Sequence, residues 1–205
     1  MPIVPCQAMA TPRLQKYPLL QKSGVFGFKN NCYNLIMALK KKKLKIAVYH
    51  EKFKQIFKKG RERIDKKVKK AEIRHIGSTA VPHLGGKGII DIMIAFSDWK
   101  TTDQSIASFK RLGFKHIHPR ENGRIFLSKN KQTGFGDIHL HLVIKNSLAY
   151  KQLLNFVNYL KKYPKAAKEY FDFKLKIAKK TGNDRAEYTK LKAGYIDSIL
   201  RRLKL

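Results

Sequence analysis

The chain has 205 residues, 43% of them hydrophobic, and its 45 Lys and Arg against 14 Asp and Glu give a formal net charge of +31. This length predicts one domain with a single core. Its two cysteines, Cys6 and Cys32, exclude a disulfide framework and have no metal-ligand spacing, so a reducing cytoplasm is expected. No apolar run approaches the roughly 20 residues that cross a bilayer, and the start of the chain is unlike a secretory leader, which predicts a soluble protein without a membrane partner.

Residues 1–43 differ in composition from the rest of the chain. They hold eight basic and four proline residues and no acidic residue, and they end on the lysines Lys40–Lys43. They show no sustained apolar period. We predict a basic, poorly ordered N-terminal extension over residues 1–43 and a single domain over residues 44–205.

In the first half of this domain, the sequence predicts two helices and two strands. An amphipathic helix follows Glu51, and strands are predicted at "EIRHIG" and "GIIDIMIAF". The second strand is almost continuously apolar, which is typical of a strand buried on both faces. A helix is then predicted at "TTDQSIASFKRLG", with Thr101 or Thr102 as its N-cap and Gly113 as its C-cap.

The second half predicts two more strands and three helices. The strands are "RIFLSK" and "DIHLHLVIK". The helices are expected at residues 147–162 and 164–180 and from Asp184 to the end, where Asp184 and Glu187 have capping-box spacing. Strands surrounded by helices predict an α/β or α+β fold, with a central sheet flanked by helices and a C-terminal helical segment.

Asp91 places a carboxylate in the middle of an apolar strand. Alternation puts it on one face of the strand together with Met93 and Ala95. A carboxylate in such a place is costly unless it is paired, hydrogen-bonded or bound to a metal. Two explanations stay open: a structural role, through a salt bridge to Lys87 or Arg124 or a hydrogen bond to a loop backbone, or a metal ligand.

The turn Gly77-Ser78-Thr79 precedes the Asp91 strand. Glycine lets the backbone approach a phosphate closely, and the hydroxyls with their neighbouring N–H groups can bind its oxygens. A simple turn or helix N-cap is the alternative. The spacing of this turn and the acid in the next strand favours a functional pair.

A second polar pattern lies in the last predicted strand. Asp137, His139 and His141 alternate with apolar residues and therefore share one face. Two imidazoles and a carboxylate can hold a divalent cation or transfer protons near neutral pH. If this strand lies beside the Asp91 strand, the two polar faces meet in one pocket.

Basic side chains suggest contacts with anions. Arg185, Tyr188 and Lys192 share a face of the last helix, where the cations can bind phosphates and the tyrosine can stack on a base. Alternatively, Tyr188 packs into the core and the cations are solvated. The net charge of +31 likewise indicates either a polyanionic partner, such as nucleic acid or a nucleotide, or only solvated helix faces.

The motifs "HIGSTAVP", "IIDIMI", "HLHLV" and "DRAEYTKLKAGYI" together resemble the GrpB-like family, from about Leu44 to the C-terminus. This family is regarded as predicted nucleotidyltransferases and is similar in fold to the polymerase-β-type enzymes. The resemblance implies a nucleotidyltransferase-like mixed sheet, a Gly77-Ser78 turn that holds a triphosphate, and acids that bind Mg²⁺. Asp91 matches the first acid of the usual pair, but Met93 stands where a second acid is expected and is no substitute for a hard oxygen ligand. His83 and Gly88 also depart from the family pattern.

Two hypotheses follow. The first is a metal-dependent nucleotidyltransferase-like protein that binds an NTP and transfers a nucleotidyl group to an unknown acceptor. Its catalytic residues would be Asp91, His139 and His141, with Asp137 added as a ligand of Mg²⁺ or another divalent cation. The expected nucleotide and phosphate contacts are Gly77, Ser78, Thr79, Lys87, Arg124, Arg185, Tyr188 and Lys192. The second is a catalytically inert RNA- or ligand-binding module on the same scaffold.

Overall fold

The computed structural model describes residue 46 and residues 48–204, apart from residues 70, 131–133, 135 and 183. The chain divides into two compact units, Met1–Lys42 and Lys43–Leu205, and every described residue belongs to the second. The extension predicted for residues 1–43 therefore lies outside the described residues.

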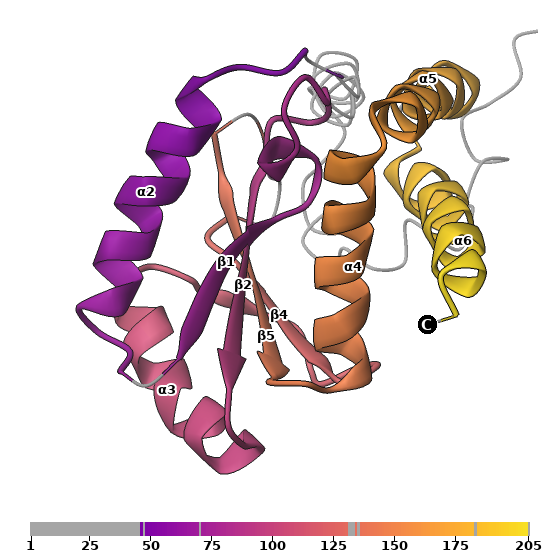
Figure 1. Ribbon diagram of the computed structural model, residues 1–205. Coiled ribbons are helices and arrows are strands. Elements are labelled where there is room, and N and C mark those ends of the chain that lie inside the picture. Colours follow the sequence, from indigo (N-terminus) through magenta and orange to yellow (C-terminus); the bar gives the residue numbers. More distant parts are fainter. Residues whose placement is uncertain are drawn as a thin grey trace, which may run out of the picture. The chain divides into compact units, whose positions relative to one another are not determined.

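A five-stranded mixed sheet forms the centre of the second unit, in the order β1-β2-β5-β4-β3 (Figure 1). Its strands are β1 (Glu72–Ile76), β2 (Ile90–Phe96), β3 (His116–Ile117), β4 (Arg124–Ser128) and β5 (Ile138–Ile144). β2 runs parallel to β5, and the other neighbouring strands are antiparallel. The α/β class with a central mixed sheet is thus confirmed.

β2 lies inside the sheet, as its apolar sequence predicts. Ile92 and Ile94 are fully buried in one core, and Met93 is fully buried in a second core on the opposite face. The alternation predicted for this strand is confirmed. Asp91 therefore faces the same side of the sheet as Met93.

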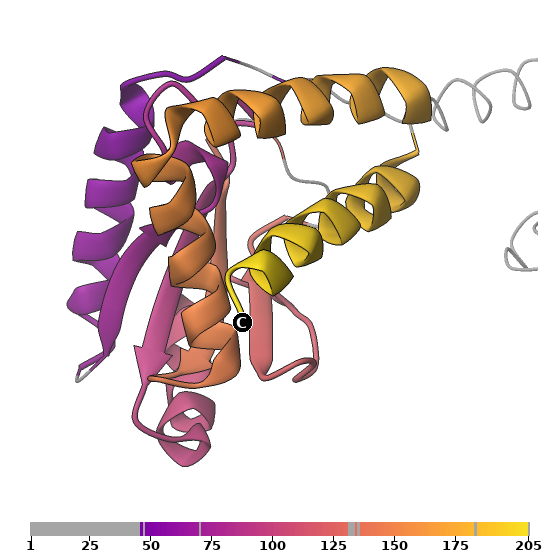
Figure 2. The same cartoon turned by 45° about the vertical axis from the view of Figure 1, so that its right-hand side comes forward.

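Helices cover both faces of the sheet (Figures 1 and 2). On one face lie α2 (Lys52–Asp65) and α3 (Trp99–Arg111), and on the other lies α4 (Leu148–Lys162). α5 (Pro164–Thr181) and α6 (Arg185–Arg202) pack against α4 and each other and form the predicted C-terminal helical segment. None of the described helices combines the length and apolar composition that a membrane span needs.

Capping residues explain where most helices begin. Ser147 precedes α4 and accepts a hydrogen bond from the Tyr150 N–H, and Asp184 does the same for α6, so both predicted starts are confirmed. The predicted N-cap of α3 is wrong. The helix begins earlier, at Trp99, because Asp98 accepts the Thr101 N–H at 2.7 Å and also receives the Thr101 hydroxyl.

We expect Asp98→Ala to lower the melting temperature by about 3 °C, because the first turn of α3 loses its acceptor. Thermal unfolding followed by circular dichroism measures the change. Asp103→Ala is the matched control, since this exposed acid of the same helix makes only a 3.4 Å contact with Arg120. Equal melting temperatures for the two variants would contradict the capping role.

Candidate functional site

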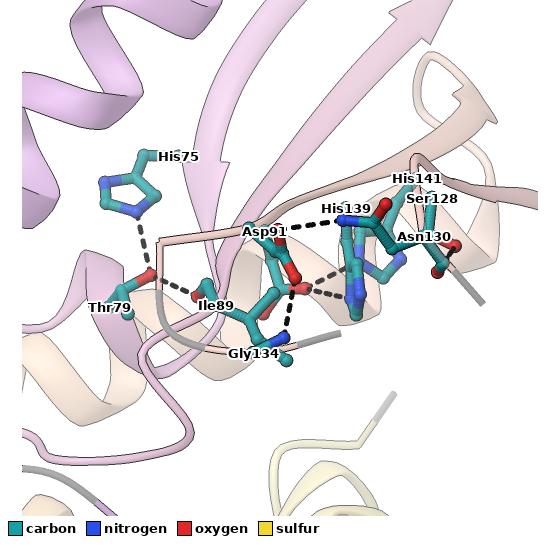
Figure 3. A network of polar contacts seen from close by, with 10 residues as sticks. His75, Thr79, Ile89, Asp91, Ser128, Asn130, Gly134, His139 and His141 are labelled. Carbon is teal, nitrogen blue, oxygen red and sulfur yellow. Dashed lines mark hydrogen bonds and ion pairs between the residues drawn. The ribbon is translucent and has the colours of Figure 1, made fainter. Parts of the chain in front are cut away.

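Asp91 and the two histidines of β5 form one cluster (Figure 3). The parallel register sets Asp91 opposite His139 and Met93 opposite His141, so the strand adjacency on which the sequence prediction depended is confirmed. Oδ1 of Asp91 lies 3.4 Å from His139 Nδ1 and 3.2 Å from His141 Nε2. Two imidazoles therefore converge on one carboxylate oxygen.

The other nitrogen of each ring is buried and has no partner among the described residues: His139 Nε2 and His141 Nδ1. Phe126 packs edge-on against both rings, with centroid distances of 4.8 and 5.3 Å. A buried N–H without an acceptor would be costly, so we infer neutral tautomers whose protons point to Asp91. Burial indeed lowers the pKa of His141, although Asp91 opposes this effect.

The carboxylate of Asp91 is the accessible part of this cluster. Burial by itself would raise its pKa, but the hydrogen bonds from His139 and His141 outweigh this and hold the pKa well below its usual range. The Asp91 side chain is 25% exposed, against 15% and 11% for the two histidines. A ligand can thus reach Asp91, whereas the histidines orient it from behind.

The Gly77 turn lies directly against Asp91. Gly77 has φ 71° and ψ −172°, and a Cβ at this position would overlap Oδ2 of Asp91. The turn continues into the short 3₁₀ helix η4 (Ser78–Ala80). Thr79 is 2% exposed and donates its hydroxyl to the Ile89 carbonyl at 3.0 Å, so it braces the turn (Figure 3). The structure therefore brings the two sequence motifs together.

Lys174, on α5, is a site residue that the sequence analysis did not identify. It is 1% exposed, and its Nζ lies 3.1 Å from the Ser78 hydroxyl and contacts the Gly85 carbonyl. Burial, together with the charge of Lys192, lowers its pKa to about 7. A signal was present: Lys174 falls on the same helix face as the buried residues Tyr170 and Ile177.

Three of the predicted phosphate contacts are close enough to act on one another. Burial, then Lys192 and Arg185, lower the pKa of Lys87 to about 8, while Asp91 opposes them. We refer to Lys87, Lys174, Arg185 and Lys192 as the cationic cluster. Within the described residues, none of these four forms an ion pair with a carboxylate. No carboxylate among the described residues therefore competes with an anion for these side chains.

Tyr188 does not offer its ring to a base in this structure. It is 2% exposed, and Lys87 Nζ lies 4.3 Å from the centroid of its ring. It therefore packs into the core and supports Lys87 through a cation–π contact. Arg124, on β4, acts through its charge on His141 and lowers the pKa of that ring.

The described residues do not fit a preformed magnesium site. Asp137 accepts the Gly134 N–H at 2.6 Å and the Asn130 amide at 3.3 Å, and Met93 is fully buried. The imidazole nitrogens nearest Asp91, which are His139 Nδ1 and His141 Nε2, point at the Asp91 carboxylate. In the part of the chain that the structure describes, no group of three or more His, Cys, Asp or Glu is arranged to hold a metal ion. Among Asp91, Asp137, His139 and His141, the Asp91 carboxylate offers the accessible hard oxygen.

Comparisons with known proteins agree on one family. The family model described as "GrpB protein" matches residues 43–202. The UPF0157 protein YqkA of Bacillus subtilis is 34% identical over 147 residues, which are 67% of this chain but only 40% of that protein's length. The crystal structure of conserved protein GrpB from Enterococcus faecalis matches with TM-score 0.69 and 25% identity, over 77% of this chain and 96% of that one. The structure of a cytoplasmic RNA terminal U-transferase is a more distant likeness, with TM-score 0.43 and 15% identity over 71% of this chain and 43% of that one.

Proposed function

Because this chain belongs to the GrpB family and its cationic cluster meets the Gly77-Ser78 turn where Lys174 contacts Ser78, we propose that it binds a nucleoside triphosphate there. The observation that carries this proposal is the cationic cluster without paired carboxylates, built on a turn whose motif resembles a triphosphate-binding turn. Such a cluster is costly unless an anion occupies it, and charge-assisted hydrogen bonds to phosphate are strong.

The geometry supports binding rather than a particular transfer step. Asp91 is ionised and hydrogen-bonded to two imidazoles, so its depressed pKa makes it a weak general base. The free nitrogens of His139 and His141 are buried, which separates them from an acceptor hydroxyl. Nucleotidyl transfer, which the sequence resemblance implies, also needs divalent ions that the described residues do not fit by themselves.

Isothermal titration of the full chain with ATP and with GTP tests the proposal. Each titration is run with and without MgCl₂, because the Asp91 carboxylate repels phosphates unless a cation lies between them. We expect Ser78→Ala to weaken binding about tenfold, since a hydroxyl contact to a charged group is lost. Ser105→Ala is the control: its hydroxyl donates to the Thr101 carbonyl within α3, which covers the other face of the sheet.

The proposal fails if the wild-type chain binds neither nucleotide, or if Ser78→Ala binds as tightly as the wild type.

The inert RNA-binding module remains the second candidate, and the fully buried Met93 in place of a second acid favours it. A salt series with an RNA oligonucleotide that has no terminal phosphate separates the two. Metal-independent RNA binding that falls steeply with salt, combined with no nucleotide binding, would support this module. Weak RNA binding beside tight nucleotide binding would exclude it.

A further inference from the structure

Lys174 is a buried amine whose direct partners are neutral. Nζ contacts the Ser78 hydroxyl and the Gly85 carbonyl, and it lies 4.7 Å from the centroid of the Tyr170 ring on its own helix. Phe171 presents a second ring, at 5.6 Å. A protonated lysine in this position would leave a charge without a counter-ion, which is unfavourable in a buried place.

We propose that at mildly alkaline pH Lys174 is a neutral amine in the free protein and takes up one proton when a terminal phosphate binds at Ser78, so that the site selects ligands that end in a terminal phosphate group. This inference rests on the proposed nucleotide binding. The proton comes from the solvent and binds the lone pair of Nζ. No bond between heavy atoms forms or breaks.

The charges around Lys174 support this assignment. Burial, together with the positive charge of Lys192 on α6, lowers the pKa of Lys174 to about 7. Ser78 on η4, Gly85 in the following loop and the rings of α5 are uncharged. A phosphate at Ser78 would supply the missing negative charge through the Ser78 hydroxyl, whose oxygen accepts from Nζ, and would raise the pKa of Lys174. Lys174 thus acts on the ligand through Ser78.

The charge of the ligand decides the strength of this effect. A terminal phosphate group has a second ionisable oxygen and, like a phosphate monoester, carries about −1.5 to −2 charges near pH 7, whereas each phosphodiester of a nucleic acid backbone carries one. The cationic cluster, with Lys174 protonated once the ligand binds, matches the first kind of ligand. The backbone of an RNA without a terminal phosphate should bind with little proton uptake.

The test is isothermal titration of the full chain with inorganic tripolyphosphate, in two buffers that differ in protonation enthalpy. Because the probe can itself lose its last proton on binding, the same titration of Lys174→Met measures the share of the probe, and the difference from the wild type reports Lys174. We expect net uptake at pH 8 and much less at pH 6, where Lys174 is already protonated. Lys87, with a pKa of about 8, also contributes, and the Lys87→Met variant measures its share.

Proton uptake that remains in Lys87→Met is assigned to Lys174, and Lys174→Met should lose most of this part. Lys174→Met should also bind the probe about tenfold more weakly. Lys176→Met is the control, because this lysine is exposed on the same helix and should keep both uptake and affinity. Uptake that persists in Lys174→Met would overturn the inference and leave nucleotide binding intact. A wild-type chain that binds neither tripolyphosphate nor ATP would instead overturn the proposed function.

Thermal unfolding of the free protein gives a second readout. A lysine whose folded pKa is lowered binds more protons when unfolded, so its penalty is full below about pH 7 and fades as pH rises toward 10.5. The melting temperature of Lys174→Met minus that of Lys176→Met should therefore fall as pH rises from 6 to 9.5. Comparing the two variants cancels the general effect of titrating surface lysines. A difference that stays constant, or a Lys174→Met protein that cannot fold at pH 6, would overturn the inference.

Discussion

Replacing Gly77 with alanine is expected to abolish nucleotide binding and to destabilise the domain by about 3 kcal/mol or more, which lowers the melting temperature by roughly 6–12 °C. Two causes add. The backbone at φ 71° and ψ −172° is a conformation that almost only glycine adopts. The added Cβ would also lie 3.0 Å from Cβ and Cγ of Asp91 and overlap its Oδ2. The turn and the carboxylate would have to separate.

Two other glycines separate these causes. Gly182 has φ 56° with nothing within 4 Å of a Cβ, so Gly182→Ala should show backbone strain alone, about 1–2 kcal/mol. Gly194 lies in α6 with open space around it, and Gly194→Ala should stabilise the helix slightly. Thermal unfolding of the three variants should rank them in this order. If Gly77→Ala and Gly182→Ala had the same melting temperature, this would contradict the close contact between Gly77 and Asp91.

The helices were predicted well because local chemistry defines their ends. Ser147 and Asp184 cap α4 and α6 where the sequence places them, and Gly182 follows α5. The start of α3 was missed because Thr101 is itself a good cap, yet in the structure it donates to Asp98. β3 has two residues, which is too short for any period to show.

Strand alternation allowed only part of the site to be predicted from the sequence. Alternation gave the faces of Asp91, His139 and His141, but the β2–β5 pairing that joins them is a long-range contact. Asp137 shares their alternation and still takes another role, because it lies before β5 begins and binds the nearby Gly134 N–H. Sequence spacing alone does not separate these outcomes.

Lys174 shows a different limit. Its partners, Ser78 and Gly85, lie 96 and 89 positions away in the sequence. Lysines are so frequent in α5 that one more on the inner face does not stand out. Tyr188 is the converse case: its spacing with Arg185 and Lys192 suggested an exposed stacking ring, and the structure buries it under Lys87. The alternative that the sequence analysis left open for Tyr188, packing into the core, is confirmed. For Lys174 the helical spacing indicated the buried face but not its partners.

Asp91→Ala is expected to destabilise the domain by about 3 kcal/mol, because two buried imidazole N–H groups lose their acceptor. Asp91→Asn should cost less, since its amide oxygen still accepts from both rings. Urea unfolding at neutral pH measures both. In nucleotide titrations without divalent ions, Asp91→Asn should bind ATP more tightly than the wild type, because a negative charge beside the phosphates is removed. Weaker binding by Asp91→Asn under these conditions would show that the phosphates do not lie near Asp91.

The pH dependence of stability distinguishes a charged Asp91 from a merely polar one. Its folded pKa is lowered, so its stabilising effect is present above the unfolded pKa of about 3.9 and is lost as pH falls through the lower folded value. The stability advantage of the wild type over Asp91→Asn should therefore hold from pH 7 to about 5 and shrink in stronger acid, where the Asp91 carboxylate gains its proton. Asp103→Asn, which alters an exposed acid, should show no comparable advantage at any pH. If the wild type and Asp91→Asn are equally stable at pH 7, the imidazoles do not hold the ionised carboxylate, and Asp91 is only a hydrogen-bond acceptor.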